Sequence, residues 1–322
     1  MTCIGLRTGF DAVAPQWDAL IARQDEPNLF LTPVWARTWW EHFRADADLC
    51  LLTVGSESDP LGIAPMTLDG DVLRFLGGTD LFDYHDFVTG DPRFYDALAD
   101  CLDGEPWRTM DLTSVPDGSP TLQEIPRVYR SRGYEVTVET EDVVPGLDLP
   151  ATWDDYLGGL RRKDRHELRR KLRRLDAAGS YRVRLSTEET LRADTALFHE
   201  LMRESREEKR DFLGPEREGF FRDIVERMQA AGILRLLLLE MDGEPIAAVL
   251  AFDYAGRRLL YNSGFRRASA SLSAGLLLKA LCVKDAIERG LTYFDFLRGA
   301  EPFKYHLGAR DASVHRIVVR RS

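Results

Sequence analysis

The same order of predicted elements occurs twice along the 322-residue chain, and this repetition limits the fold more than any other feature. In each half, three successive strand-like runs are followed by a helix pattern and a further strand. These segments are residues 49–54, 61–68, 72–76, 94–102 and 109–112, and then 233–241, 246–254, 258–265, 274–289 and 293–297. Strands grouped in antiparallel meanders predict a mixed α/β fold of the α+β class, built from a duplicated unit.

The prolines and the charged segment between the two repeats predict the domain boundaries. A chain of this length is expected to hold two cores. Pro145 and Pro150 close the first half, and a charged helical pattern follows as far as Gly179. We therefore predict an N-terminal domain over residues 1–150, a basic connecting helix over 151–179 and a C-terminal domain over 180–322. The last strand of that second domain is predicted at 313–320.

Composition excludes several classes of protein. The formal net charge of −10 argues against general binding to nucleic acid, so no DNA partner is expected. No apolar run reaches the roughly 20 residues that span a bilayer, and the first residues lack the apolar core of a signal peptide. A cytoplasmic protein is predicted, with peripheral membrane contact left open. The four cysteines form no C-x-x-C pair, so we expect reduced thiols.

The familiar motifs of several enzyme classes are absent. The sequence has no G-x-G-x-x-G after a strand, no G-x-x-x-x-G-K-[ST], no H-E-x-x-H and no G-x-S-x-G. Dinucleotide binding, nucleotide hydrolysis by a P-loop, zinc proteolysis and serine hydrolysis therefore lack their signatures. No metal ion is predicted.

The connecting helix is strongly basic on one side. Its leucines form one stripe, and nine Arg and Lys residues between 161 and 174 lie off it. One interpretation is a solvated face whose exposed ion pairs contribute little stability. The alternative is recognition of phosphates on a coenzyme, a nucleic acid or a membrane, since arginine forks bind phosphate oxygens. The sequence leaves these open.

A loop over residues 77–87 interrupts the first half with two glycines, three acids and His85. Loops of this composition often carry function. Asp83 and Asp86 could bind or deprotonate an amine acceptor in a cleft between the two halves. The competing interpretation is that the acids cap turns and the aromatic residues fill the core.

Several segments together resemble the FemAB-like group of GNAT-fold acyltransferases, including the CelD-like proteins of polysaccharide biosynthesis. The resemblance runs nearly end to end. It rests on Phe30-Leu31-Thr32-Pro33-Val34-Trp35, Leu76-Gly77-Gly78 with Asp83-Tyr84, Arg165-xxx-Arg169, Ser263-Gly264-Phe265, Ser273-Ala274-Gly275, Phe294-Asp295-Phe296 and Gly299-xx-Pro302-Phe303-Lys304.

The resemblance implies two GNAT-like halves, of which the second binds the acyl donor, acyl-CoA such as acetyl-CoA. The residues implied for donor binding are Ser271, Ser273, Ala274, Gly275, Gly264, Arg165 and Arg169. Lys304 is implied as the cation that contacts the donor and supports transfer, and Tyr305 as a general acid for the departing thiolate. The competing interpretations are a serine-capped helix, a surface lysine after a proline turn, and a core aromatic residue.

The chain departs from the usual GNAT phosphate loop, because it offers only Gly275 and has Ala274 where relatives often carry proline. The leading hypothesis is direct acyl transfer to an amine or hydroxyl of a small-molecule or saccharide acceptor, with the carbonyl polarised by backbone N–H groups of a splayed strand near residues 261–265. The alternatives are a FemAB-like transferase that uses aminoacyl-tRNA, for which the basic helix would contact the tRNA, and a non-catalytic binding protein of a polysaccharide pathway.

Overall fold

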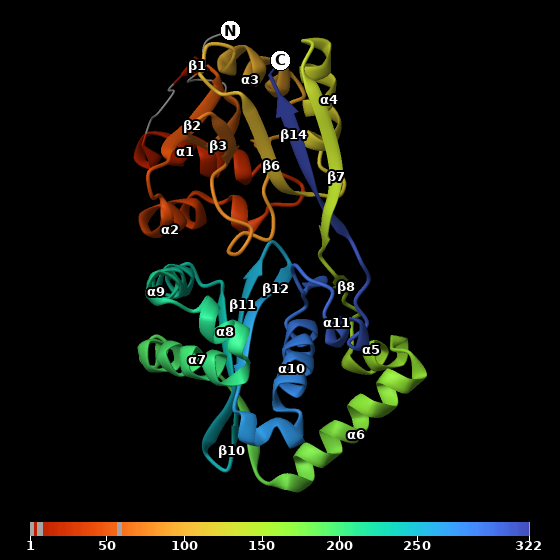
Figure 1. Ribbon diagram of the computed structural model, residues 1–322. Helices are drawn as coiled ribbons and strands as arrows, with labels where there is room; N and C mark the ends of the chain where they lie inside the picture. Colours follow the sequence, from red (N-terminus) through yellow and green to blue (C-terminus); the bar gives the residue numbers. More distant parts are fainter. Residues whose placement is uncertain (1–2, 5–8, 57–59, 322) are drawn as a thin grey trace. The chain divides into compact units, whose positions relative to one another are not determined.

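The computed structural model describes residues 3–4, 9–56 and 60–321, and the chain forms two compact units. Unit 1 contains Met1–Val143 and Ala312–Ser322, and unit 2 contains Val144–Asp311. Figure 1 shows that each unit is a sheet with helices on both faces. Within the described part of the chain, no helix combines the length and the apolarity needed to cross a bilayer.

The sheet of unit 1 has the strand order β1-β2-β3-β4-β6-β14-β7, with β5 beside β3. Its strands are β1 (Cys3–Ile4), β2 (Asp48–Gly55), β3 (Pro60–Asp69), β4 (Val72–Phe75), β5 (Val88–Thr89), β6 (Thr109–Pro116), β7 (Glu135–Val143) and β14 (Ser313–Arg320). Its helices are α1 (Phe10–Ile21), α2 (Pro33–Phe43), α3 (Arg93–Leu102) and α4 (Thr121–Ser131), with a short helix η1 (Leu29–Leu31).

Alternation along the strands of unit 1 fills both faces of its sheet. Leu52 and Met66 lie in the core formed with α3 and α4, whereas Leu51 and Ile63 lie in the core formed with α1 and α2. Successive side chains of a strand point to opposite faces, so a strand buried on both sides reads as a continuous apolar run. The predicted hairpin of residues 49–54 and 61–68 is confirmed as the antiparallel pair β2–β3.

The sheet of unit 2 has the order β8-β13-β12-β11-β10-β9. Its strands are β8 (Gly146–Asp148), β9 (Tyr181–Leu185), β10 (Leu234–Met241), β11 (Glu244–Tyr254), β12 (Arg257–Phe265) and β13 (Tyr293–Asp295). Its helices are α5 (Trp153–Gly159), α6 (Arg162–Ala178), α7 (Leu191–Ser205), α8 (Glu207–Phe212), α9 (Pro215–Ala230), α10 (Ala274–Glu288) and α11 (Pro302–His306), with η2 (Arg267–Leu272).

The duplication predicted from the sequence is present in the topology. In unit 1 the antiparallel meander β2-β3-β4 leads through α3 to β6, which lies parallel to β4. In unit 2 the meander β10-β11-β12 leads through α10 to β13, which lies parallel to β12. The same path of chain therefore occurs twice.

Three predicted elements differ from the structure. The strand at 313–320 does not close the second sheet, because β14 pairs with β6 on one side and β7 on the other in the first sheet. The connecting helix breaks at Leu160, whose backbone is extended, and its halves α5 and α6 belong to unit 2. The helix expected at 188–209 divides into α7 and α8 at Arg206, which is also extended.

The prediction that the cysteines are reduced thiols is confirmed for two of the four residues. Cys50 and Cys282 are buried free thiols. Cys101 is disulfide-bonded, so the expectation of a reduced thiol is wrong there. The side chain of Cys3 lies outside the described residues.

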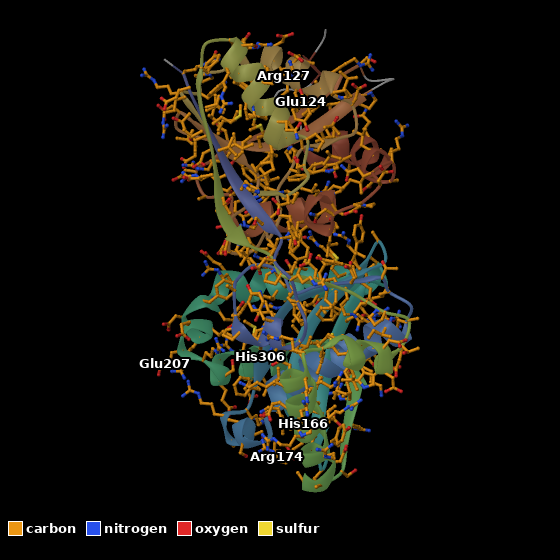
Figure 2. All side chains as sticks on the ribbon, turned by 90° about the vertical axis from the view of Figure 1, so that its right-hand side faces the viewer. Glu124, Arg127, His166, Arg174, Glu207 and His306 are labelled. Atoms are coloured by element: carbon orange, nitrogen blue, oxygen red, sulfur yellow. The ribbon has the colours of Figure 1, made fainter. Side chains whose placement is uncertain are left out.

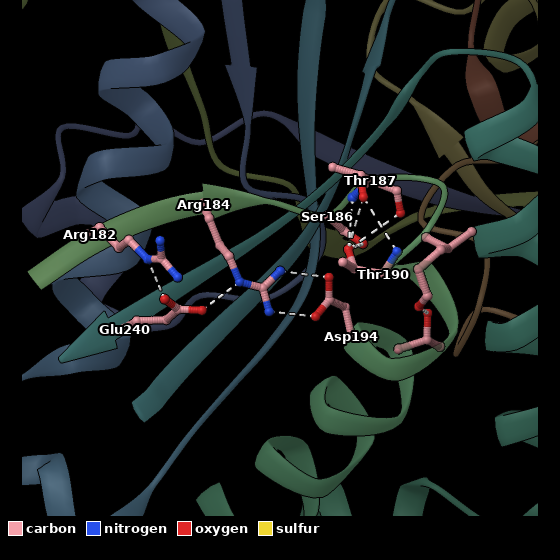
Figure 3. Close-up of polar contacts among 9 residues, drawn as sticks. Arg182, Arg184, Ser186, Thr187, Thr190, Asp194 and Glu240 are labelled. Carbon is pink, nitrogen blue, oxygen red and sulfur yellow. Dashed lines mark hydrogen bonds and ion pairs between the residues drawn. The ribbon is translucent and has the colours of Figure 1, made fainter. Parts of the chain in front are cut away.

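An arginine fixes the outer edge of the second sheet to its helix layer (Figure 3). Arg184 of β9 donates to Glu240 of β10 at 2.5 Å and, through both terminal nitrogens, to Asp194 of α7 at 2.6 and 2.7 Å. Both carboxylates are buried, and a bidentate arginine pair fixes orientation as well as distance. The end of the sheet and the start of α7 are thereby held together.

Candidate functional site

The two parallel strands of unit 2 separate after a short paired stretch. β12 and β13 pair only through Arg257↔Tyr293, Arg258↔Phe294 and Leu259↔Asp295. β12 then continues to Phe265 with β11 on its other edge, and it carries a bulge at Tyr261. Among the described strands, none pairs with this last part of β12 on the β13 side. In this part of β12, side chains bond the backbone of Ser263: its N–H donates to Asn262 Oδ1 at 2.8 Å, and its carbonyl accepts from Lys209.

The loop that follows β12 leads directly into the N-terminus of α10. Ser273 has a left-handed backbone with φ 59°, and the helix begins at Ala274. The serine side chain does not cap the helix, which the sequence analysis had considered. Ala274 and Gly275 are buried, and a Cβ atom on Gly275 would lie 2.9 Å from the ring of Phe265. The first N–H groups of α10 have no acceptor within the helix, and helix ends of this kind favour anions.

Two basic side chains of α6 contact this loop. Lys171 Nζ donates to Ser273 Oγ at 2.7 Å, and Arg174 donates to the carbonyl of Ser271. The sequence analysis placed the loop and two arginines of the basic helix in one donor site, but it did not select Lys171 or Arg174. Figure 2 labels Arg174 together with His166 on α6 and His306 on α11.

The two arginines expected to bind the donor lie elsewhere on α6. Arg165 donates to the carbonyl of Gly158 at 2.9 Å, and Arg169 is exposed. At about 100° per residue, Lys171 lies roughly 240° around the helix from Arg165, and Arg174 roughly 180°. The structure therefore brings Lys171 and Arg174, rather than Arg165 and Arg169, to the loop.

A pocket of about 420 Å³ lies beside this loop, between α6, the first turn of α10 and α11. Its charged lining comes from α6, and Leu276, His306 and Leu307 complete it. A more open hollow of about 590 Å³ also follows α6. The first volume is within the range of small-molecule sites, which are usually apolar with a few convergent polar groups.

Two lysines that the sequence analysis did not select lie near the end of β12. Lys209 of α8 donates to Asn262 Oδ1 at 2.8 Å and to the carbonyl of Ser263. Lys279 of α10 donates to the carbonyl of Gly275 at 3.3 Å and lies 4.7 Å from the ring centroid of Phe303. Burial, with smaller effects of neighbouring charges, lowers the pKa of Lys209 to about 7 and that of Lys279 to about 8. No local motif marks either lysine.

Lys304 is buried and holds a loop rather than facing solvent. Its ammonium donates to the carbonyls of Leu297, Arg298 and Gly299 at 2.8, 2.7 and 2.8 Å, and it lies 2.9 Å from Glu301 Oε2. A lysine has three N–H donors, so these carbonyls use all of them. The interpretation as a surface lysine is wrong, because its exposed fraction is 2%. Its direct contact with a donor stays a prediction.

The other predicted catalytic residues are divided between the units. Tyr305 of unit 2 donates its hydroxyl to Asp311 Oδ1 at 2.7 Å. In unit 1, Asp86 Oδ1 accepts from Thr121 Oγ1 at 2.5 Å and from the N–H of Phe87 at 2.8 Å, and burial raises its pKa. Asp83 is half-buried in the same loop. These contacts give Asp86 a role in fixing the loop against α4.

Gly264 is required by close packing between a strand and a helix. A Cβ atom there would lie 2.3 Å from the backbone nitrogen of Met202 and 2.4 Å from the carbonyl carbon of Leu201. Because backbone atoms of α7 cannot rotate away, the helix itself would have to shift. The contact explains the glycine without assigning it to a donor.

Replacing Gly264 by alanine is therefore expected to destabilise unit 2 by about 3 kcal/mol, the upper end for overpacking. Urea unfolding checks this value. Gly159→Ala is the matched control, since a Cβ at Gly159 has no atom within 4 Å. Equal stability of the two variants would show that α7 moves at little cost.

Comparison with known proteins agrees with this geometry. Residues 162–305 match the family model described as an acetyltransferase (GNAT) domain. The crystal structure of FemX superimposes with a TM-score of 0.67 at 13% identity, covering 98% of this chain and 97% of FemX. No curated protein matches by sequence.

Two further solved structures share the fold over the whole chain. A tandem GNAT protein from the clavulanic acid biosynthesis pathway gives a TM-score of 0.53 at 14% identity, covering 98% of this chain and 97% of that one. The C-terminal domain of a putative lysylphosphatidylglycerol synthetase from Agrobacterium fabrum gives 0.60 at 11%, covering 98% and 93%. The predicted mixed α/β class with two GNAT-like halves is confirmed. Residues 162–305 thus match a GNAT acetyltransferase domain, and the whole chain has the fold of FemX and of the tandem GNAT protein.

Proposed function

We propose that the acyl donor is a CoA thioester and that the acyl group passes directly to an amine or hydroxyl of a small-molecule or saccharide acceptor. One observation carries the proposal: β12 separates from β13 and leads into a loop and helix N-terminus that Lys171 and Arg174 of α6 contact. Strand N–H groups and helix N–H groups therefore follow one another along one segment, and two cations of α6 lie against its loop.

Each part of this segment has a chemical task in the proposed reaction. Backbone N–H groups of β12 beyond Leu259 donate to the thioester carbonyl oxygen and stabilise the negative charge that develops there. The first turn of α10, together with Lys171 and Arg174, binds the phosphates of the donor. Catalysis then rests on positioning and on oxyanion stabilisation.

Removing the charges next to the loop is expected to weaken binding of acetyl-CoA about tenfold or more, since each charge-assisted hydrogen bond contributes about 1.5–3 kcal/mol. The variant is Lys171→Met with Arg174→Met. The matched control is Arg169→Met with Arg173→Met, which removes two exposed charges from another face of α6. Calorimetric titration and thermal stabilisation by acetyl-CoA and free CoA measure the difference.

If no CoA compound stabilises the chain, the proposed donor is wrong. Equal weakening by both double variants would mean that α6 acts only through its overall charge. Urea unfolding of all variants without ligand separates lost binding from lost loop structure. Release of free thiol in the presence of an acceptor distinguishes an enzyme from a binding protein.

The second candidate donor is aminoacyl-tRNA, and the observation that favours it is the exposed basic surface of α6 that faces away from the loop. Arg169, Arg170 and Arg173 are exposed there, and only Arg170 has an ion-pair partner among the described residues, Glu167. A tRNA would use this surface as well as the loop. In that case Arg169→Met with Arg173→Met would weaken tRNA binding and reduce its salt dependence.

A further inference from the structure

Three ammonium groups surround the place where β12 and β13 separate. Lys209 lies on β12 at Asn262 and Ser263, just beyond the last residue that pairs with β13. Lys279 lies one turn into α10 and over Phe303 of α11. Lys304 holds the segment that follows β13. Three separate helices therefore bring lysines to this opening.

Positive charge exceeds negative charge in this cluster. Besides the larger effect of burial, the charge of Lys279 lowers the pKa of Lys209, and Arg206 lowers the pKa of both lysines. Lys304 adds a further cation beside Lys279. Glu301 is the carboxylate, among the described residues, that acts on both Lys209 and Lys279, and it is already 2.9 Å from Lys304. Partly buried charges without a counter-ion are costly, which favours a ligand that supplies one.

The hydrogen bonds of the lysines leave donors for such a ligand. Lys304 has used its three N–H groups on carbonyl oxygens. Lys209 uses two, and Lys279 uses one, within the part of the chain that the structure describes. An ammonium group has three donors, so Lys209 retains one and Lys279 two. None of the protein acceptors of these two lysines is a carboxylate.

We propose that the opening between β12 and β13 binds an anionic group of a substrate, a carboxylate or a phosphate, and that Lys209 and Lys279 hold this group. The inference rests on the proposed function, because it adds a charge requirement to the substrate of the same site. The anionic group can belong to the acyl moiety of the donor or to the acceptor. Charge-assisted hydrogen bonds from two ammonium groups would select it over a neutral analogue of the same shape.

Matched pairs of probes test the charge requirement and distinguish its two sources. Succinyl-CoA and butyryl-CoA differ in a terminal carboxylate on the acyl chain, and glucosamine 6-phosphate and glucosamine differ in a phosphate on an acceptor amine. At pH 7, at least one anionic member is expected to bind about tenfold more tightly than its neutral partner. The preference should grow from pH 8.5 to pH 6.5, because the protonated fraction of both lysines rises as pH falls through their pKa values of about 8 and about 7.

Variants identify the groups responsible. Lys209→Met with Lys279→Met is expected to reduce the preference to less than about twofold. Lys284→Met is the control on the same helix, because Lys284 is partly exposed and lies 3.6 Å from Glu288. The Lys284→Met variant should bind the anionic probe in preference to the neutral one as strongly as wild type does. An anionic preference that survives in the double variant would overturn the assignment to these lysines.

A second measurement does not depend on CoA. The rate at which an amine-labelling reagent modifies each lysine is followed by mass spectrometry, with and without succinate or inorganic phosphate. Protection of Lys209 and Lys279 but not of Lys284 is the expected result. If no CoA thioester binds but this protection occurs, the proposed donor fails and the anion site stands. Equal binding within both pairs, together with unprotected Lys209 and Lys279, overturns the anion site and leaves the donor proposal intact.

Discussion

Lys304→Met is expected to abolish most transfer activity and to lower the free energy of unfolding of unit 2 by about 4 kcal/mol, because the variant leaves buried carbonyl groups and a carboxylate without their partner. Other side chains cannot easily replace the ammonium group of Lys304. Three carbonyl oxygens at 2.7–2.8 Å surround a compact charge, and the planar fork of arginine does not match that arrangement. Lys304→Arg should therefore rescue little.

The effect on activity is expected to act through the loop that Lys304 holds. Leu297 has φ 59°, which is uncommon for a residue with a side chain, and Gly299 has φ 105°. Asp295 supports the same turn by accepting the N–H of Leu297 at 2.8 Å. Without the lysine, the three carbonyls would turn toward water and the segment after β13 would change shape. Hydrogen exchange at residues 297–299 should rise sharply in the variant.

The measurement also tests the role that the family resemblance implies. If Lys304→Met unfolds at the wild-type urea concentration and keeps normal exchange at residues 297–299, yet loses activity, then Lys304 acts on the donor directly. If stability and activity fall together, Lys304 is a positioning residue. Lys284→Met provides the control for loss of a lysine from unit 2.

Arg258→Met is expected to destabilise unit 2 by about 3–5 kcal/mol, the usual effect of breaking a buried ion pair from one side. Arg258 is fully buried and donates to both oxygens of Asp253 at 2.7 and 2.9 Å, to Asp285 at 2.5 Å and to the carbonyl of Cys282 at 3.0 Å. These bonds join the start of β12 to the last turns of α10. Their loss frees the helix whose N-terminus forms the proposed phosphate site.

The expected pH dependence follows from Asp253. Burial raises the pKa of this carboxyl, but the hydrogen bond and charge of Arg258, together with Arg235, outweigh burial and hold the pKa below its ordinary value. A carboxyl with a lowered folded-state pKa contributes stability above its unfolded value of about 3.9, and this contribution is lost as pH falls through the folded-state pKa. The difference between wild type and variant should therefore shrink below about pH 4.

Urea titrations between pH 3 and pH 7 measure that difference. Arg257→Met is the comparison variant on the same strand, because its guanidinium lies over the ring of Tyr293 at 4.7 Å and the residue is half-buried rather than fully buried, so its loss should cost less than the loss of Arg258. Adding Asp253→Asn to Arg258→Met should recover part of the loss, since it removes the buried charge left without its main partner. If the difference in free energy of unfolding between wild type and Arg258→Met were the same at all pH values, the role given to Asp253 would be wrong.

Much of the fold can be predicted because it follows from local pattern. The apolar runs that became β2, β3, β10 and β11 are long and separated by turns that contain a glycine, so their antiparallel pairing could be predicted from the sequence. The repeated order of strands and helices then predicted that the chain has two related halves. The break between α5 and α6 was missed, although Gly158 and Gly159 precede it.

The site was less accessible to sequence reasoning, for physical reasons. Lys209 and Lys279 are single lysines in helices, and only the tertiary fold shows that they meet β12 and α11. Lys304 could be selected by resemblance, but its three acceptors depend on a loop whose left-handed residue carries a leucine side chain. The contacts of Lys171 and Arg174 could not be predicted without knowing which face of α6 packs against the rest of unit 2.

The strand β14 was assigned to the wrong sheet because its alternating pattern would suit either one. Its position between β6 and β7 has a consequence for synthesis on the ribosome. Domains usually fold in order as the chain emerges, but the first sheet here lacks an interior strand until residues 313–320 have left the exit tunnel. Unit 2 can be completed first, although it begins later in the chain. Until then, β6 and β7 have open edges, and this nascent stage is when the protein is most exposed to aggregation.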